Sequence, residues 1–223
     1  IEPYLAMLYG IALPPDVHQQ YTDDTGFHNK AIAGIGTDSD WCLDQAHSRS
    51  YSVGDQRLMM TDPADLDEDE YLIWGADQDN YSSMVTLVAN PIADARLSRT
   101  WLIEEQGEVG ATTIQINVEG LGLNSADYVD MGLLVSATPY DYTNPRIIMS
   151  DAWSNNTLYF NDVDLDDGEV FTLATGITFN DQDRDGIADG SDDDADNDGI
   201  LNSQEGTDDQ DGDGLGNHQD LDS

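Results

Sequence analysis

Apolar and polar residues alternate with a period of two in parts of the first 180 residues. The clearest case is the segment 112–118, in which Ile114, Ile116 and Val118 interleave with Thr113, Gln115 and Asn117. Successive side chains of a strand point to opposite faces of its sheet, so this pattern is typical of a strand with one buried face. The body of the chain is therefore predicted to consist mainly of β-strands.

Short apolar or alternating runs recur along the body, with Gly, Pro, Asn or Asp residues between them. We predict strands at residues 31–35, 49–53, 56–60, 71–74, 84–89, 96–104, 112–118, 131–137, 146–150, 158–160 and 169–174. The dipeptide formed by Asp167 and Gly168, just before the last run, is a hairpin signal. Many short strands with turn residues between them favour a mainly β fold, a β-sandwich of Ig-like or Greek-key type.

The start of the chain follows a different spacing. Its apolar residues recur as they do on one face of a helix, at Tyr4, Leu5, Met7, Leu8 and Ile11. Pro14 and Pro15 end this pattern, because proline does not continue a helix. We therefore predict a short helical lead-in at residues 1–15, followed by a β-sandwich domain at residues 16–180.

The chain is strongly acidic, with 46 Asp and Glu residues against seven Lys and Arg residues and a formal net charge of -39. This charge excludes nucleic acids and anionic membranes as partners on electrostatic grounds, and it favours cations. Residues 181–223 alone contain 16 acidic residues and one basic residue, Arg184. Such a segment has too little apolar surface to fold against its own charge repulsion unless divalent cations neutralise it.

The last 43 residues contain three consecutive segments spaced like the calcium loop of an EF-hand. In that loop, oxygen-bearing side chains occupy positions 1, 3, 5, 9 and 12, and the residue at position 7 offers its backbone carbonyl. Gly186, Gly199 and Gly214 occupy position 6, where the chain turns sharply and a Cβ atom would hinder the turn. An apolar residue follows each glycine, and its side chain is free to turn outward and pack on the neighbouring loop. Residues 181–223 are thus predicted to be an irregular arm that holds about three Ca²⁺ ions.

The predicted calcium ligands are the residues at these positions. In the first loop they are Asp181, Asp183, Asp185, Ile187, Asp189 and Asp192. In the second loop they are Asp194, Asp196, Asp198, Ile200, Asn202 and Glu205. In the third loop they are Asp209, Asp211, Asp213, Leu215, Asn217 and Asp220.

The spacing between the loops distinguishes this arm from true EF-hands, which place a helix on each side of the loop. Only Asp193 separates the first loop from the second, and residues 206–208 separate the second from the third, so no helix fits between them. The arm resembles thrombospondin type 3 repeats, in which Asp-rich loops stack along a row of calcium ions. It lacks the cysteines of the animal repeats and is more similar to the bacterial form, which occurs in secreted and surface proteins. The resemblance implies calcium-dependent rigidity.

The body resembles a poorly characterised domain of secreted, multidomain bacterial surface proteins, often found after a laminin-G-like domain. The motifs that carry the resemblance are YLA (4–6), YGI (9–11), GIG (34–36), LIWG (72–75), RLSRTW (96–101), EQG (105–107), Gly110 and FTLA (171–174). The family brings no known catalytic activity. The resemblance implies a sandwich fold and a surface location.

Three other features of the body have two interpretations each. The acidic run of Asp62, Asp65, Asp67, Glu68, Asp69 and Glu70 is either a further calcium site or a solvated loop, and the missing glycine register favours the loop. Lys30 next to Asn29 suggests a Lys–Asn crosslink, for which the sequence locates no buried carboxylate. The tryptophans Trp41, Trp74, Trp101 and Trp153 either line a sugar-binding face or belong to the core, which is the expectation for those in predicted strands.

The sequence offers little for catalysis, and we expect a protein that is not an enzyme. His18, His28, His47 and His218 have no metal-ligand spacing, and no nucleophile elbow, phosphate loop or dinucleotide fingerprint occurs. Glu104 and Glu105 are adjacent, so in a strand they would point to opposite faces rather than act as a pair. Cys42 is the only cysteine, which excludes an intramolecular disulfide, and it is expected to be a small buried residue.

These observations predict an extracellular or cell-surface subunit with a structural or adhesive role, stabilised by calcium. The location follows from calcium, because open sites of this kind bind at about 10⁻⁴ to 10⁻³ M and cytosolic calcium would not fill them. The expected partner is a second copy of the chain, in a filament, or a neighbouring surface protein. The alternative is a carbohydrate-binding or spacer segment of a larger secreted protein, with a glycan as partner. Neither hypothesis involves nucleic acid or membrane insertion.

Overall fold

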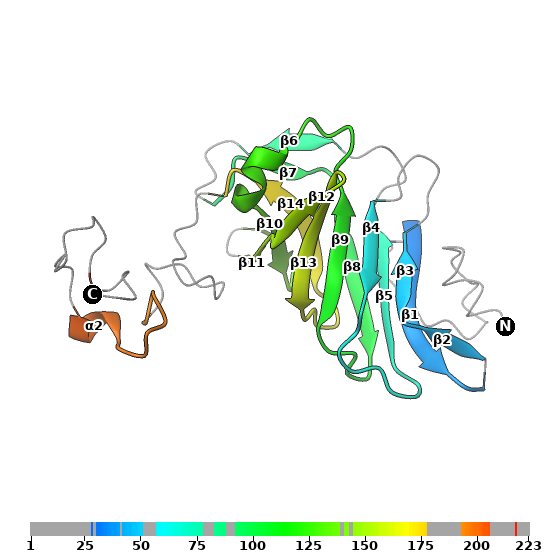
Figure 1. Ribbon diagram of the computed structural model, residues 1–223. Coiled ribbons are helices and arrows are strands. Elements are labelled where there is room, and N and C mark those ends of the chain that lie inside the picture. The colour runs from blue at the N-terminus through cyan, green and yellow to red at the C-terminus, as the bar shows by residue number, and fades with distance from the viewer. Residues whose placement is uncertain are drawn as a thin grey trace.

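The computed structural model describes residues 28, 30–40, 42–50, 57–77, 83–87, 92–138, 141–142, 145–177, 193–205 and 217. The predicted helical lead-in at residues 1–15 lies outside this part of the chain. Within it, the fold is mainly β, as predicted, and two antiparallel sheets pack face to face as a sandwich (Figure 1). The strands that the structure describes lie between Lys30 and Thr175.

The larger sheet, which we call sheet A, has nine strands, all paired antiparallel. Seven of them lie side by side in the order β11 (Arg146–Met149), β10 (Met131–Ser136), β14 (Val170–Thr175), β8 (Trp101–Gln106), β5 (Tyr71–Ala76), β1 (Lys30–Asp38) and β2 (Leu43–Gln45). The other two are β7 (Ala95–Leu97), which pairs with β14, and β6 (Met84–Thr86), which pairs with β7.

The smaller sheet, sheet B, has five strands, also paired antiparallel. Their order is β12 (Ala152–Ser154), β13 (Thr157–Val163), β9 (Thr112–Asn117), β4 (Leu58–Thr61) and β3 (His47–Arg49). The helical elements of the described residues are a 3₁₀ helix, η1 (Ser125–Asp130), and a single helical turn, α2 (Asn202–Glu205). No helix in the described ranges has the length and apolar character needed to cross a membrane.

The main core fills the space between the two sheets. Trp74, Trp101 and Phe171 from sheet A, and Phe160 from sheet B, are among its largest buried side chains. The rings of Trp101 and Phe171 stack with their centroids 5.3 Å apart. Aromatic residues of this size bury a large apolar area each, so burial in this core is the main stabilising term of the sandwich. Trp74 and Trp101 are core residues, as predicted for tryptophans within strands.

The outer faces of the two sheets differ. Sheet A carries two further apolar clusters outside the main core, one around Ile73 and one around Leu134. Sheet B alternates instead: in β9, Ile114 and Ile116 are buried while Gln115 and Asn117 on the other face are partly exposed. This confirms the alternation predicted for the segment 112–118. A sheet with one apolar and one polar face covers a core on one side and meets solvent on the other.

Most of the predicted strands coincide with strands of the structure, but the segment 96–104 was wrongly predicted as a single strand. It divides into β7 and β8, both of which pair with β14. Between them the chain leaves the regular ladder, and Thr172 Oγ1 lies 3.1 Å from the Leu97 carbonyl and 2.8 Å from the Arg99 carbonyl. A buried threonine hydroxyl thus replaces part of the interrupted backbone pairing.

The predicted hairpin at Asp167 and Gly168 is also wrong. These residues do form a turn, but it joins β13 of sheet B to β14 of sheet A and therefore connects the two sheets. The tight hairpin lies elsewhere, at Asn155 and Asn156, where the φ angles are 50° and 58° and β12 returns as β13. Two consecutive left-handed residues match the twist of a two-residue hairpin, and asparagine tolerates that conformation.

Cys42 is a further correction. It is exposed, not buried, and lies in the turn between β1 and β2 with a φ angle of 56°. The apolar surface of this hairpin is instead supplied by Leu43, which packs in the cluster with Ile32, Tyr71 and Ile73. The position of Cys42 in a tight turn, rather than its residue type, decides its exposure.

Candidate metal sites

The second predicted calcium loop is the part of the arm that the structure describes. Its six predicted ligands lie within residues 193–205, while those of the first loop lie outside the described residues. Of the third loop, only Asn217 is described, and it is partly buried.

The loop turns as the spacing predicted. Gly199, at position 6, has a φ angle of 93°, which an L-residue with a Cβ atom rarely adopts. The backbone N–H groups after the turn donate to the aspartates: Gly199 N to Asp194 Oδ2 at 3.2 Å, and Ile200 N to Asp198 Oδ1 at 2.7 Å. These bonds hold the carboxylates against the turn and on its inner side.

Three carboxylates converge inside this loop. One oxygen each from Asp194, Asp196 and Asp198 lies within 4.8 Å of the others, so the three can hold one metal ion. Asp196 is the most buried, with 5% of its surface exposed. Its Oδ1 accepts a hydrogen bond from Asp198 N at 3.3 Å, whereas its Oδ2 is buried and makes no hydrogen bond. A buried carboxylate oxygen without a donor is costly unless a cation contacts it.

The electrostatics of the cluster agree with its geometry. The pKa of Asp196 is raised above its usual range, chiefly because burial removes water from the charged form and also because Asp198 and Asp194 lie close by. A raised carboxyl pKa means that the local structure disfavours the ionised form. A divalent cation between the three groups would reverse this preference.

The end of the loop contributes two more predicted ligands. Asn202 begins the single turn of α2, and its side-chain Oδ1 accepts a hydrogen bond from Ala195 N at 2.9 Å. Its own N–H donates to the Asp193 carbonyl at 2.8 Å, which closes the loop between its two ends. Glu205, at position 12, ends the same helical turn and is partly buried. Ile200 has 45% of its surface exposed, so its side chain points outward, as expected of position 7.

A second group of carboxylates in the sandwich could also hold a metal ion. Asp38 at the end of β1, and Glu68 and Asp69 in the loop before β5, place one oxygen each within 4.8 Å of one another. Asp38 is buried, and Tyr71 Oη donates to its Oδ2 at 2.5 Å. The Tyr71 ring reaches this position because it lies against Gly36, where an added Cβ atom would approach it to 2.5 Å.

Burial and nearby acidic charges raise the pKa of two residues at this second group, Asp69 and Tyr71. The pKa of Asp69 is raised by the loss of surrounding water and by the charges of Asp38, Glu68 and Asp40. The pKa of Tyr71 is raised chiefly by burial and by its hydrogen bond to Asp38. Sequence reasoning considered the run from Asp62 to Glu70 as a calcium site but omitted Asp38. The pairing of Gly36 with Tyr71 brings β1 next to this loop, and no short-range pattern in the sequence predicts that pairing.

The loops that join β4 to β5, β8 to β9 and β13 to β14 lie at one end of the sandwich (Figure 1), and all three contain acidic residues. Backbone bonds connect these loops to one another and to β8: Asp65 N donates to the Val109 carbonyl, and Gly168 N donates to the carbonyl of Ile103 in β8, both at 3.0 Å. We call this region the acidic end. Its acidic residues are Asp62, Asp65, Asp67, Glu68, Asp69, Glu70, Glu104, Glu105, Glu108, Asp164, Asp166, Asp167 and Glu169.

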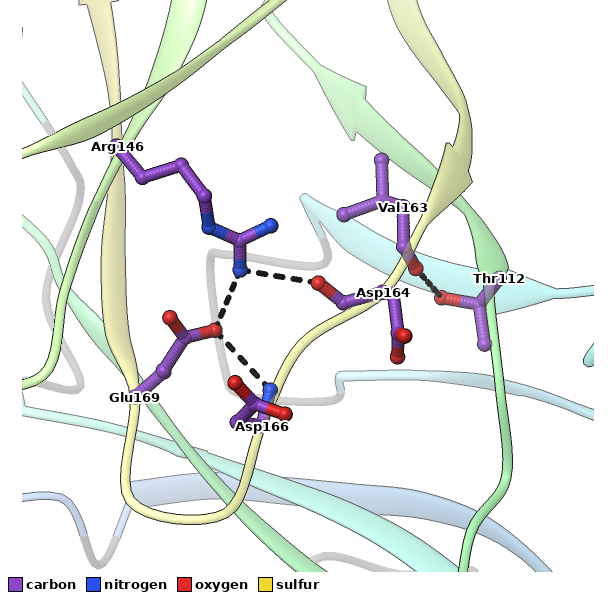
Figure 2. Close-up of polar contacts among 6 residues, drawn as sticks. All are labelled: Thr112, Arg146, Val163, Asp164, Asp166 and Glu169. Atoms are coloured by element: carbon purple, nitrogen blue, oxygen red, sulfur yellow. Dashed lines mark hydrogen bonds and ion pairs between the residues drawn. The ribbon is translucent and has the colours of Figure 1, made fainter. Parts of the chain in front are cut away.

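One arginine lies at the acidic end. Figure 2 shows the Arg146 guanidinium between Glu169 and Asp164: Nη2 is 2.6 Å from Glu169 Oε2 and donates to the Asp164 carbonyl at 3.0 Å. The same Glu169 oxygen accepts from Asp166 N at 3.0 Å. Glu105 accepts a bond from Val109 N at 2.9 Å, and its pKa is raised, first by desolvation and then by the charges of Glu108, Asp164 and Asp166.

The residues considered for catalysis lie apart. His28 is buried, with Nε2 2.9 Å from Thr100 Oγ1, whereas His47 is exposed on β3. Glu104 pairs with Ile73 and Glu105 with Leu72 across β5, which places them on opposite faces of sheet A, as predicted. His18 and His218 lie outside the described residues, as do Asn29 and Trp41, while Trp153 is partly buried.

Residues 1–169 match a protein family described as a domain of unknown function, DUF8202. The match covers more than half of the chain, and the chain belongs to this family. The matched region contains most of the sandwich and ends before residues 181–223. Neither the curated proteins nor the solved structures provide a match.

Proposed function

We propose that this protein is an extracellular structural or adhesive subunit whose C-terminal arm binds Ca²⁺ and becomes rigid when it does so. The observation that carries the proposal is the convergence of Asp194, Asp196 and Asp198 in a loop of calcium-binding spacing. Asp196 Oδ2 is buried and accepts no hydrogen bond, and a bound cation would compensate for this loss of solvation.

The chemistry of the donors supports calcium over transition metals. Residues 193–205 contain neither His nor Cys, so every candidate ligand is an oxygen. Hard oxygen donors suit Ca²⁺, Mg²⁺ or Mn²⁺, whereas zinc and copper prefer nitrogen and sulfur. Ca²⁺ accepts six to eight oxygens in flexible geometry, which fits a loop of aspartates, an amide and a carbonyl, whereas Mg²⁺ requires near-ideal octahedral geometry. The same spacing in all three loops favours a row of such ions along the arm.

The proposed location and assembly follow from this chemistry. An open loop of this kind binds calcium at about 10⁻⁴ to 10⁻³ M, which extracellular but not cytosolic calcium supplies. The resemblance of the arm to thrombospondin type 3 repeats supports a stiff connector at a cell surface. A stiff arm on a compact sandwich suits a subunit that joins copies of itself, or a neighbouring surface protein, in a fixed direction.

Calcium titration of matched variants tests the binding site. Asp196→Asn removes the charge of the most buried carboxylate, and we expect calorimetry to show at least tenfold weaker binding at one site. Asp193→Asn is the control, because it makes the same chemical change at an exposed neighbour outside the ligand positions. Equal calcium affinity in both variants and in the wild type would exclude the second loop as a calcium site.

Electron microscopy tests the structural role. With millimolar calcium we expect the purified protein to form filaments, and we expect excess chelator to disperse them. Single particles in both conditions would refute self-assembly and leave calcium as an internal stiffener. Binding to a panel of polysaccharides without self-association would instead support the carbohydrate-binding alternative.

A further inference from the structure

The outer face of sheet B differs in charge from the acidic end. A row of side chains crosses all five strands on this face, because its members are register partners from strand to strand. We call this row, together with His47 two residues before its first member, the sheet B face. Its residues are His47, Arg49, Met59, Gln115, Tyr159 and Ala152.

This face is accessible, and none of its six residues is acidic. Asp62 lies at its edge, just after β4, where its Oδ2 accepts a hydrogen bond from Thr61 Oγ1 at 2.6 Å. His47, Arg49 and Ala152 are exposed, and the other members are partly exposed. The strands of sheet B contain one acidic residue, Asp162, which lies beside the register shift of β13, outside the row. The chain as a whole has 46 acidic residues among 223, so an open surface without carboxylates is unusual for this protein.

Arg49 gives the sheet B face its positive charge. Its guanidinium Nη2 contacts Met59 Sδ at 3.3 Å, and in the described part of the chain no carboxylate lies within ion-pair distance of it. Arg146, by contrast, is paired with Glu169. An exposed arginine on a flat face is available for bidentate contact with a carboxylate from another molecule.

The acidic end of the sandwich is complementary to this face. Its exposed carboxylates include Glu108, Asp164 and Asp166, which raise the pKa of the nearby Glu105. Carboxylates gathered in this way attract a positively charged group of another molecule. Complementary charge on two surfaces speeds their association and disfavours partners of like charge. Both surfaces belong to the same chain but to different regions of it.

We propose that the sheet B face binds the acidic end of a second copy of this chain. The inference rests on the proposed function, because it names the surfaces by which the subunits would join. Contact between two different surfaces is heterologous and, unless it closes into a ring, continues from copy to copy as a filament. The calcium-loaded arm would then act beside this contact rather than supply it.

The contact is expected to be weak for a single pair. Five strands about 4.8 Å apart, each with a rise of about 3.3 Å per residue, give a face of roughly 20 Å by 20 Å. This is small beside the roughly 800 Å² that each partner buries in a standard interface. Self-association should therefore require high protein concentration and weaken in salt, since exposed charges are screened within about 10 Å at 0.1 M.

Sedimentation velocity of the full chain in millimolar calcium tests the face. We expect a concentration-dependent series of oligomers for the wild type and at least tenfold weaker association for Arg49→Glu. Lys30→Glu is the charge-matched control, because it makes the same charge change on β1 of sheet A and should associate like the wild type. Melting temperature and calcium affinity should be unchanged in both, which separates the interface from folding and from the arm.

A mixing experiment tests the pairing of the two surfaces. The second variant combines Glu108→Gln, Asp164→Asn and Asp166→Asn, whose side chains are exposed. We expect each variant alone to be monomeric. Their mixture should form one-to-one dimers and nothing larger, because each partner retains one intact surface.

The outcomes separate the two proposals. Wild-type monomers at every concentration would overturn both the subunit role and this interface. Wild-type oligomers that Arg49→Glu leaves intact would overturn the interface alone. A mixture that stays monomeric would also overturn the interface alone. So would an Arg49→Glu variant that self-associates like the wild type and loses only its affinity for an anionic polysaccharide such as heparin.

Discussion

The sandwich and the acidic loop at residues 193–205 differ in what their folded forms bury. Between the sheets, Trp74, Trp101, Phe160 and Phe171 are fully buried and belong to one apolar cluster. In residues 193–205 the buried residues are Ala195 and Asp196, while the large apolar residues Ile200 and Leu201 are 45% and 43% exposed. The loop has buried a carboxylate where the sandwich buries aromatic rings.

This difference indicates which of the two regions needs a bound ligand to be stable. Apolar burial of the sandwich contributes roughly 25 cal/mol per Å² and needs no ligand. The loop has little apolar area to offset its chain entropy, and its charges repel one another, so its ordered form is expected to depend on a cation. Stability of the sandwich and calcium affinity of the arm should therefore respond to different changes.

The largest effect is expected from the core. Phe160→Ala should lower the free energy of unfolding of the sandwich by about 3–5 kcal/mol, because it leaves a cavity between the sheets. Asn161→Ala, at the next and exposed position of β13, should change it by about 0.5 kcal/mol or less. Chemical denaturation followed by tryptophan fluorescence measures both. A parallel loss of calcium affinity in Phe160→Ala would show that sandwich and arm fold as one unit.

Removal of calcium should have the converse effect. We expect hydrogen exchange at the backbone amides of Gly199 and Ile200 to become at least tenfold faster in chelator, because the aspartates that accept their hydrogen bonds would then repel one another. Amides in β9 and β14, in the middle of the sheets, should exchange at the same rate in both conditions. Uniform acceleration throughout the chain would mean that the sandwich also depends on a bound ion, with the group of Asp38, Glu68 and Asp69 as the first candidate.

A smaller effect is expected from pH. Glu105 has a raised pKa in the folded protein, so the folded state binds its proton more tightly than the unfolded state, whose carboxyl titrates near about 4.3. Its contribution to stability should therefore increase as the pH falls from 7 towards the raised pKa, and level off below the unfolded value.

Glu105→Gln removes this contribution while keeping an acceptor for Val109 N. Thermal melting between pH 7 and 4.5 should show a smaller rise on acidification for the variant than for the wild type, by less than about 1 kcal/mol, because the group is partly solvated. Asp44→Asn, which neutralises an exposed carboxylate on β2, serves as the control. Identical pH profiles for Glu105→Gln and the wild type would contradict the assignment.

The smallest effect is expected at the ion pair in Figure 2. The side chain of Arg146 is 43% exposed, so its pair with Glu169 lies in a largely aqueous environment. Arg146→Gln should destabilise the sandwich by less than about 1 kcal/mol, and 1 M salt should abolish most of the difference. Arg146→Lys keeps the positive charge but removes the planar guanidinium, so it separates the effect of charge from that of hydrogen-bond geometry. A loss of several kcal/mol would mean that charges, and not only apolar burial, hold this end of the sandwich together.

Local patterns predicted much of the fold. Alternation located β9 and showed which of its faces is buried, and the apolar runs located most of the other strands. The short strands β2 and β12, of three residues each, escaped prediction. The break between β7 and β8 also escaped, since it depends on the Thr172 hydroxyl, which lies more than 70 residues away in the sequence.

The sequence by itself determined the strand-rich class of the body, the turn of the second loop and the three aspartates that meet in it. These depend on spacing of two to five residues, which the backbone converts directly into geometry. The tertiary structure alone decided that Asp38 joins Glu68 and Asp69, that three loops form one acidic end, and that Arg49 lies on a face without carboxylates. Each of these depends on strand register, which is set by how the whole core packs and not by neighbouring residues.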